Sequence, residues 1–381
     1  MRFRSVAILS LVFTYVFFAA YLSPFRKVHI PFDLEGYHYP LLDYAFQGVA
    51  SGRLPLWDAA IYCGQTLAGN IQAALFYPGT WVLFAANIFR RRLTFQGVQM
   101  FELAHVWLGF LLSYLWFSRR KLSSLASALG AGVFAYSGYM CLQLQHQGLV
   151  TSMAWFPLGF LGIDEANDSR SVRPLWKLAV ASSFVFLAGY PPQWAIFALC
   201  AGAYAVARIG QWRWLALGSA SALLLSLALS AMQLLPSMEA TKWMLIDARY
   251  GLGLKDPWFY LSYVVPNYWA FGMHMPVDTN FGRDYFYLGA VGLFGLGAWF
   301  TARRWRESAP LLGMLLVSVI GLTNPWNLVW SSIQNSEMLG SVLRSWYFIA
   351  GVSVALSGLA AIGIDAFLAR SGRFYRPLLA L

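Results

Sequence analysis

Long apolar segments recur along almost the whole chain, and they limit its possible folds more than any single motif does. Of the 381 residues, 59% are hydrophobic and only 11% are charged, whereas soluble domains carry about 25% charged residues. A helix needs about 20 apolar residues to cross a bilayer, and a strand of a membrane barrel needs about half that number. The apolar segments have helical length. The sequence therefore predicts an all-α polytopic membrane protein.

The distribution of charge fits about ten transmembrane helices with both termini in the cytoplasm. This threading places 16 of the 27 Lys and Arg residues in short cytoplasmic loops, as the positive-inside rule requires. Most carboxylates fall on the outer side. The net charge of +11 does not indicate nucleic-acid binding, because the basic residues form short clusters at helix ends. The predicted spans are about 5–23, 96–117, 122–140, 149–163, 175–190, 193–207, 214–234, 286–302, 309–323 and 347–368.

In this threading one transmembrane domain covers 1–381, and three long segments lie on the outer side: 24–95, 235–285 and 324–346. The first of them is far longer than a connector between two spans needs to be, so we expect it to be folded and to contain short interfacial helices. Its apolar part, 76–89, is too short to span and is followed by three arginines. We expect an interfacial or re-entrant helix there.

Ordered motifs along the chain resemble those of a known family. They are GRLPLWDAAIYCGQTLAGNIQAALFYP (52–78), AYSGYM (135–140), AWFPLGFLGID (154–164), AGYPPQW (188–194), AMQLLPSMEATKWMLIDAR (231–249) and LRSWYFIAGVSVALSGLAAIGID (343–365). In this order they resemble the bacterial YfhO-type membrane proteins, which belong with the GT-C glycosyltransferases. Each string alone is weak, and the specificity lies in their co-occurrence over almost the whole chain.

The resemblance implies a GT-C-like helical fold in a bacterial cytoplasmic membrane, with catalysis in the first outer loop. It implies transfer of a sugar from a polyprenyl-phosphate carrier to an extracytoplasmic glycan, lipid or protein, with inversion at the sugar carbon and no role for nucleic acid. Two departures stand out. Thr66 replaces the proline usual in the family, and many relatives are considerably longer, so the chain resembles a short or partial member.

Two carboxylates early in the first outer loop suit such a reaction. An acceptor hydroxyl must lose its proton as it attacks the sugar, and a carboxylate can accept it. Asp33 lies about ten residues past the first predicted span, at the height of a lipid headgroup. In an extended segment Glu35 would face the same side, so one carboxylate could act as the base while the other orients the acceptor or a divalent cation (Mg²⁺ or Mn²⁺). The alternative is that both are solvated loop charges or helix caps.

Two histidines and one glutamate within a predicted span are further candidate site residues. His38 could bind phosphate or relay a proton, or be an ordinary surface histidine. His146 follows the third predicted span through a short loop, so it is expected near the membrane surface. Glu102 and His105 share one face of the second span. An ionisable residue there is a functional candidate because its burial is costly; alternatively Glu102 reaches the outer interface or pairs with His105.

Phosphate binding favours arginine, whose planar fork matches phosphate oxygens. Arg344 has no acidic neighbour in its sequence segment, and Arg249 and Arg283 are weaker candidates because an aspartate lies close to each. The alternative for all three is headgroup anchoring or a salt bridge.

Amides and aromatic rings in the motif 52–78 suit sugar recognition. Asn70 and Gln72 are the candidate amides, and Trp57 and Tyr77 are the aromatic residues, for which a role in fixing the loop is favoured. Three functions remain open from sequence: a glycosyltransferase, which we favour, a transporter or flippase for lipid-linked saccharides, and a non-catalytic scaffold. A transporter would be expected to show internal repeats, and none is clear.

Overall fold

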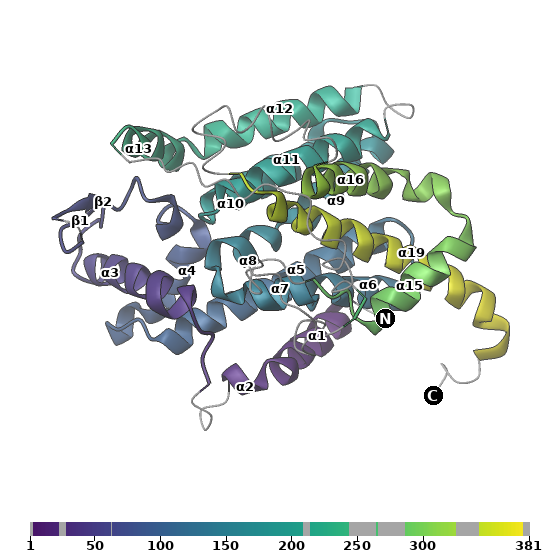
Figure 1. Ribbon diagram of the computed structural model, residues 1–381, viewed down its shortest axis with the longest axis horizontal. Coiled ribbons are helices and arrows are strands. Elements are labelled where there is room, and N and C mark those ends of the chain that lie inside the picture. Colours follow the sequence, from purple (N-terminus) through teal and green to yellow (C-terminus); the bar gives the residue numbers. More distant parts are fainter. Residues whose placement is uncertain are drawn as a thin grey trace.

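Helices make up most of the structure, a computed structural model that describes residues 3–22, 28–61, 63–208, 214–243, 264–265, 286–324 and 343–375 (Figure 1). Within these ranges the only strands are β1 (Trp57–Asp58) and β2 (Gln65–Thr66), which pair antiparallel as a small hairpin. The predicted all-α class is therefore confirmed for the described part of the chain.

The helices of the first half are α1 (Phe3–Phe17), α2 (Ala19–Leu22), the π-helical turn η1 (Leu34–His38), α3 (Tyr39–Ala50), η2 (Ile71–Ala73), α4 (Pro78–Asn87), η3 (Ile88–Arg90), α5 (Phe95–Arg119), α6 (Ser124–Ala135), α7 (Gly138–Leu142), η4 (Gln143–Gln145), α8 (Gln147–Met153) and α9 (Phe156–Ser169). The later helices are η5 (Arg173–Leu175), α10 (Trp176–Leu187), α11 (Pro191–Val206), α12 (Trp214–Leu229), α13 (Ala231–Thr241), α15 (Ala290–Ala302), α16 (Trp305–Thr323), η9 (Ser345–Phe348) and α19 (Ile349–Tyr375).

Several of these helices are long and apolar enough to cross a membrane, which identifies the chain as a membrane protein. Four described segments meet the length and hydropathy of a span: Phe95–Arg119, Ser124–Gln145, Trp305–Thr323 and Ser345–Ser371. A fifth is formed if α12 and α13, which are bent by 70° to one another, count as one. Described helices cover all ten predicted spans, but the remaining ones are shorter, so ten crossings stay a prediction.

Several predicted spans are divided between two helices, and the clearest case lies in the middle of the chain. The segment predicted as 149–163 contains the end of α8 and the start of α9, which are separated by Ala154 and Trp155. Pro157 lies in the first turn of α9, where the missing N–H of proline costs nothing but would interrupt a continuous helix. Pro191 similarly begins α11 directly after the turn at Gly189, which has φ +98°. Prolines thus shorten the central helices.

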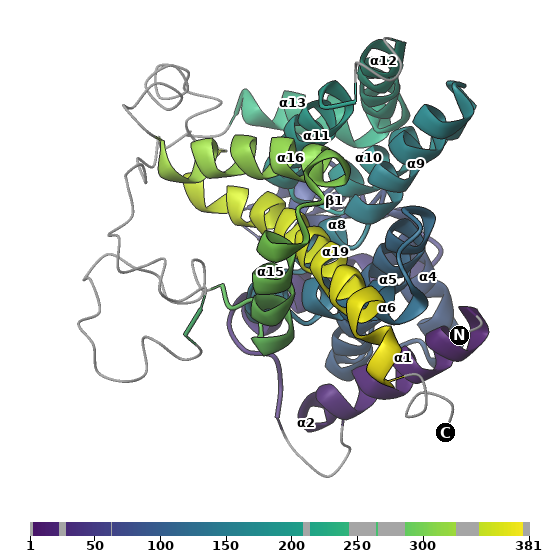
Figure 2. The same cartoon turned by 90° about the vertical axis from the view of Figure 1, so that its right-hand side faces the viewer.

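Small residues bring α15 and α19 into close contact (Figure 2). A side chain added at Gly295 would meet the backbone of Ala360, and one added at Gly363 would collide with the backbone of Gly295 and Trp299. The glycine-rich run 290–300 is therefore a helix-packing face. Helix α19 also packs against α6 and α16, so three helices enclose it.

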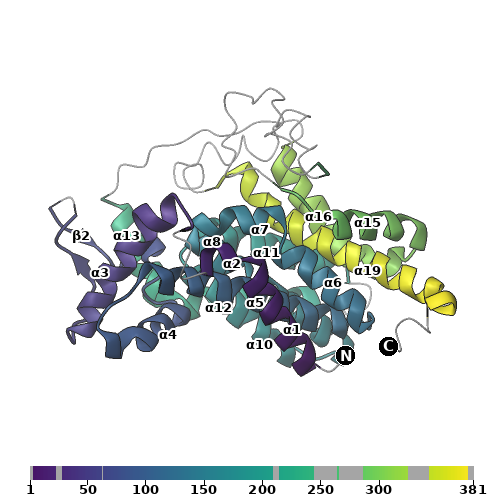
Figure 3. The ribbon, with the colours of Figure 1, turned by 90° about the horizontal axis from the view of Figure 1, so that it is seen from below.

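The first polar loop is folded and projects from one end of the bundle, together with α13 (Figure 3). The amide N–H of Ile30 donates to Gln99 on α5 over 2.7 Å, and the Tyr39 hydroxyl donates to the carbonyl of Leu93 over 3.3 Å. Farther along, Gln233 on α13 donates to the carbonyl of Ala68 over 2.9 Å. The loop is thus fixed to α5 and α13, and the bond to Leu93 joins two parts of the loop itself.

Helix α4 occupies the apolar stretch predicted to be interfacial or re-entrant. It has 10 residues, which correspond to about 15 Å of helix, or half the apolar thickness of a bilayer. Thr80, Leu83, Phe84 and Asn87 on one side are buried. A single crossing by α4 is therefore excluded by its length, and its interfacial position stays a prediction.

Candidate active site

A short helix with unusual geometry presents Asp33. Phe32 has φ +62°, a left-handed conformation that is costly for an aromatic residue. Asp33 follows as the N-cap of the π-helical turn η1, which continues into α3. Such π turns are rare and frequently occur at functional sites. The strained residue and the π turn together set the position of the Asp33 carboxylate.

His146 reaches Asp33 from the other side of the site, because η1 packs against η4. The His146 Nε2 lies 3.3 Å from Oδ2 of Asp33, and Nδ1 lies 2.6 Å from Oε1 of Gln143. The Asp33 side chain is 58% exposed while that of His146 is 15% exposed, and Gln143 is fully buried. The two residues predicted separately, 113 positions apart, thus form one site with an accessible carboxylate. We call Asp33, His38, Gln143 and His146 the Asp33 site.

The two ring nitrogens of His146 face two different groups. With the amide oxygen of Gln143 assigned to face the ring, Nδ1 of His146 carries a hydrogen and donates it. Nε2 then faces the Asp33 carboxylate over 3.3 Å. A carboxylate that lies beside an imidazole and stays accessible to solvent is a suitable candidate for a general base.

His38 lies beside this pair but is not a charged ligand. It is 4% exposed and its Nδ1 has no hydrogen-bond partner among the described residues. Burial, together with the nearby His146, lowers the pKa of His38 to about 3. It is therefore neutral at physiological pH, so the expected phosphate binding by a charged His38 is not supported. A neutral hydrogen-bonding role remains.

The structure corrects the predicted relation of Glu35 to Asp33. The segment is helical and not extended, so residues two apart point in different directions, and Glu35 is exposed to solvent. Among the described residues, no three His, Cys, Asp or Glu side chains are placed to hold a metal ion. The two carboxylates therefore do not face the same side, as an extended segment would have required.

The other two acidic residues of the loop have local structural partners. Asp43 on α3 accepts a hydrogen bond from Gln47 one turn later, over 3.3 Å. Asp58, which is 1% exposed, accepts the N–H of Ala60 over 2.8 Å and so caps the turn after β1. Both contacts are local and indicate structural roles.

The candidate amides Asn70 and Gln72 lie close to η1. The Asn70 amide donates to the Tyr37 hydroxyl over 3.2 Å, and its oxygen accepts the backbone N–H of Gln72 over 3.1 Å. Gln72 itself is exposed. The backbone of Ile71 and Gln72 touches Gly189 so closely that a side chain there would collide with it. Asn70 thus shapes the loop, whereas the Gln72 side chain is available to a ligand.

Arg344 lies at the start of η9 and is half-buried. Three residues later, the Tyr347 hydroxyl accepts a hydrogen bond from that of Tyr190 over 3.2 Å. Tyr190 follows Gly189, so Arg344 belongs to a segment packed near the loop that carries Gln72. Arg249 and Arg283 lie outside the described residues.

Glu102 is not paired with His105, contrary to one of the alternatives drawn from sequence, and it does not reach the surface. It is 0% exposed, and neither carboxyl oxygen has a hydrogen-bond partner among the described residues. His105 instead contacts the hydroxyl of Tyr77 over 2.7 Å, and the indole of Trp155 donates to the same hydroxyl over 2.7 Å. Tyr77 therefore fixes the loop to α5 and to the turn between α8 and α9, the structural role favoured for it from sequence.

Gln143 is the member of the site that sequence reasoning missed. It stands three residues before His146 in LQLQHQG, which is the spacing of two side chains on one helical face. That spacing is a usable signal, but it does not show that the amide is buried. Comparisons with known proteins add nothing further, since no protein-family model matches the chain and no similar curated protein was found.

Proposed function

We propose that the protein is a membrane glycosyltransferase of the GT-C type. In this proposal it transfers a sugar from a polyprenyl-phosphate donor to an acceptor outside the cytoplasm of a bacterial cell. The observation that carries the proposal is the accessible Asp33 carboxylate in contact with half-buried His146 at one end of a helical membrane protein. The ordered motifs that resemble YfhO-type proteins supply the reaction class.

In the proposed reaction the acceptor oxygen forms a bond to C1 of the sugar as the bond between C1 and the phosphate oxygen breaks. The hydroxyl proton passes to the Asp33 carboxylate, and the leaving phosphate takes the bonding electrons. His146 keeps the carboxylate oriented through Nε2, while Gln143 fixes the imidazole ring through Nδ1. Attack opposite to the leaving group inverts the configuration at C1.

The remaining candidates are assigned to binding in this proposal. Arg344 would neutralise the donor phosphate, and the exposed Gln72 amide and Trp57 ring would contact a sugar. Trp57 is 58% exposed and lies in the hairpin β1–β2. Glu35 is exposed on the same helical turn as Asp33 and would contact the acceptor only at a point away from the reacting hydroxyl.

A second candidate, translocation of a lipid-linked saccharide, is favoured by different observations. Glu102 is an unpartnered, fully buried carboxyl group in a helix long enough to span, and such groups mark proton or ion pathways. The 70° bend between α12 and α13 resembles the discontinuous helices of transporters. This candidate predicts movement of the donor lipid without transfer.

Purified full-length protein in proteoliposomes distinguishes the two. The vesicles would receive a panel of radiolabelled polyprenyl-phosphate sugars and washed membranes from a strain that lacks the protein. We expect Asp33→Asn to lower the transfer rate by about 10² to 10⁴, the usual contribution of a general base. The matched control, Asp43→Asn, removes a carboxylate of the same loop and should leave transfer within about twofold. Undiminished transfer by Asp33→Asn would refute the mechanism, and translocation without transfer would favour the transporter.

A further inference from the structure

A strongly basic cavity lies at the far end of α5 from the Asp33 site. Helix α5 has 25 residues, so its two ends are about 37 Å apart. The cavity has a volume of about 740 Å³, within the range of ligand sites. Its basic side chains are Arg119, Arg120, Lys121, Arg208, Arg304 and Arg306. We call it the Arg120 pocket.

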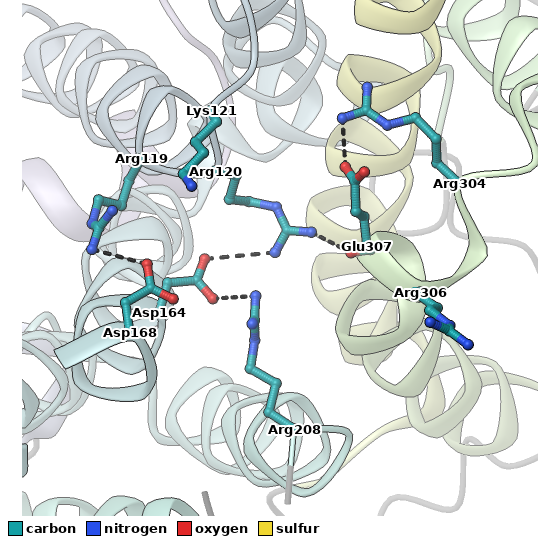
Figure 4. A pocket seen from close by; sticks show the side chains of 9 residues that line it. All are labelled: Arg119, Arg120, Lys121, Asp164, Asp168, Arg208, Arg304, Arg306 and Glu307. Atoms are coloured by element: carbon teal, nitrogen blue, oxygen red, sulfur yellow. Dashed lines mark hydrogen bonds and ion pairs between the residues drawn. The ribbon is translucent and has the colours of Figure 1, made fainter. Parts of the chain in front are cut away.

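A buried carboxylate organises the deepest part of the Arg120 pocket (Figure 4). Asp164 is 3% exposed and accepts hydrogen bonds from the indole of Trp116 and the hydroxyl of Tyr204. Arg208 lies 2.7 Å and Arg120 lies 3.5 Å from its oxygens. The two guanidinium groups come from the ends of two different helices. Their contacts hold them in fixed positions, unlike the charge of a flexible side chain on the surface.

The lining carries more positive than negative charge. Six basic residues face three acidic ones, Asp164, Asp168 and Glu307. Asp168 pairs with Arg119 over 2.9 Å, and Glu307 pairs with Arg304. Lys121 and Arg306 have no ion pair with any described residue. The pocket therefore has an excess of about three positive charges and cations that are available at its rim.

We propose that the Arg120 pocket binds a phosphate group. Two ordered guanidinium groups with a cationic rim suit phosphate, whose oxygens accept paired N–H donors. The position at the ends of apolar helices is where the headgroup of an anionic phospholipid lies, while a soluble phosphate compound would offer the same chemistry. This proposal is independent of the proposed function, because no residue of the Asp33 site takes part.

The ordinary alternative is that these residues only anchor the helix ends to the bilayer, as basic residues often do. Anchoring depends on the number of positive charges on that side of the protein. It does not depend on whether these charges line one cavity. Two pairs of variants separate the explanations. Lys121→Gln with Arg306→Gln removes two exposed cations that line the cavity. Arg170→Gln with Arg303→Gln removes two exposed cations at the same end that do not line it.

Binding would be measured on detergent-purified full-length protein with two probes. Native mass spectrometry would report dioleoyl phosphatidic acid against zwitterionic dioleoyl phosphatidylcholine, and titration calorimetry would report inorganic pyrophosphate. We expect at least one phosphate probe to bind and the Lys121→Gln, Arg306→Gln protein to bind it about 30-fold more weakly, equivalent to about 2 kcal/mol. The Arg170→Gln, Arg303→Gln protein should bind as the wild type does.

Each outcome decides the proposal. Weakened binding of phosphatidic acid alone supports a lipid headgroup as the ligand, and weakened binding of pyrophosphate alone supports a soluble phosphate compound. Weakening of both shows that the pocket recognises the phosphate itself. Failure of both probes to bind, or an equal loss in the two double variants, would overturn the proposal.

Discussion

The two ends of α5 use ionisable residues in opposite ways. At the Asp33 site one exposed carboxylate contacts one histidine, and a neutral amide and a neutral histidine lie around them. At the Arg120 pocket a buried carboxylate is surrounded by arginines and by the hydroxyl and indole groups that hold it. The first arrangement leaves an acid–base group accessible with few competing charges, and the second keeps charges in fixed positions.

The difference indicates which end is suited to chemistry and which to binding. A general base must exchange a proton, so it cannot be locked by several cations. A carboxylate that contacts two guanidinium groups, an indole and a hydroxyl is instead held in place and contributes to structure. Asp33 and Asp164 are therefore expected to respond differently to the same substitution, one in activity and the other in stability.

Asp164→Asn should produce the larger loss of stability. It leaves Arg120 and Arg208, whose side chains are 7% and 14% exposed, without their buried carboxylate. Breaking a buried ion pair by removing one partner costs about 3–5 kcal/mol. We expect a clear drop in the thermal midpoint of the detergent-purified protein, measured by intrinsic fluorescence.

Asp168→Asn is the matched control for this substitution. Asp168 lies one turn later on the same helix, but its side chain is 44% exposed and its pair with Arg119 is near the surface. Exposed pairs contribute about 0–1 kcal/mol. If Asp164→Asn were no more destabilising than Asp168→Asn, the described contrast between the two ends would be wrong.

A smaller, pH-dependent effect is expected at the Asp33 site. The pKa of His38 is lowered from 6.5 to about 3 by burial and by His146, so the unfolded chain binds one more proton than the folded chain between these values. Stability from a neutral His38 is therefore complete above pH 6.5 and is lost as the pH falls toward 3. The slope is about 1.4 kcal/mol per pH unit.

The thermal midpoint at pH 7 and pH 5 tests this effect in two variants. His38→Gln cannot titrate, so it should lose less stability on acidification than the wild type, by about 2 kcal/mol over the interval below pH 6.5. His29→Gln removes an exposed histidine and should behave as the wild type does. Equal acid sensitivity of the wild type and His38→Gln would show that His38 is not the titrating group.

The fold could be predicted from the sequence where the burial of apolar side chains alone decides the local structure. Apolar runs of spanning length correctly marked α5 and α19, because burial of apolar side chains dominates there. The split between α8 and α9 was missed because hydropathy ignores the position of Pro157. The extended prediction for the segment of Asp33 was wrong because hydrogen bonds within η1, and not side-chain periodicity, fix its geometry.

The sequence predicted several residues of the Asp33 site but not which of them contact one another. Asp33 and His146 were each singled out by residue type and expected position, but their contact joins segments 113 residues apart and depends on how η1 packs against η4. His105 had an obvious partner in Glu102 by helical spacing, yet it bonds to Tyr77 from the loop. Local spacing predicts a shared face, and only the tertiary structure shows which partner occupies it.

A double-mutant cycle on sugar transfer tests the central claim that Asp33 and His146 act as one unit. The rates of the wild type, Asp33→Asn, His146→Gln and the double variant would be measured in the proteoliposome assay. Because His146 is a positioning residue that acts through Asp33, we expect the double variant to be no slower than Asp33→Asn alone. A double variant whose loss equals the product of the two single losses would contradict this account, because the two residues would then act separately.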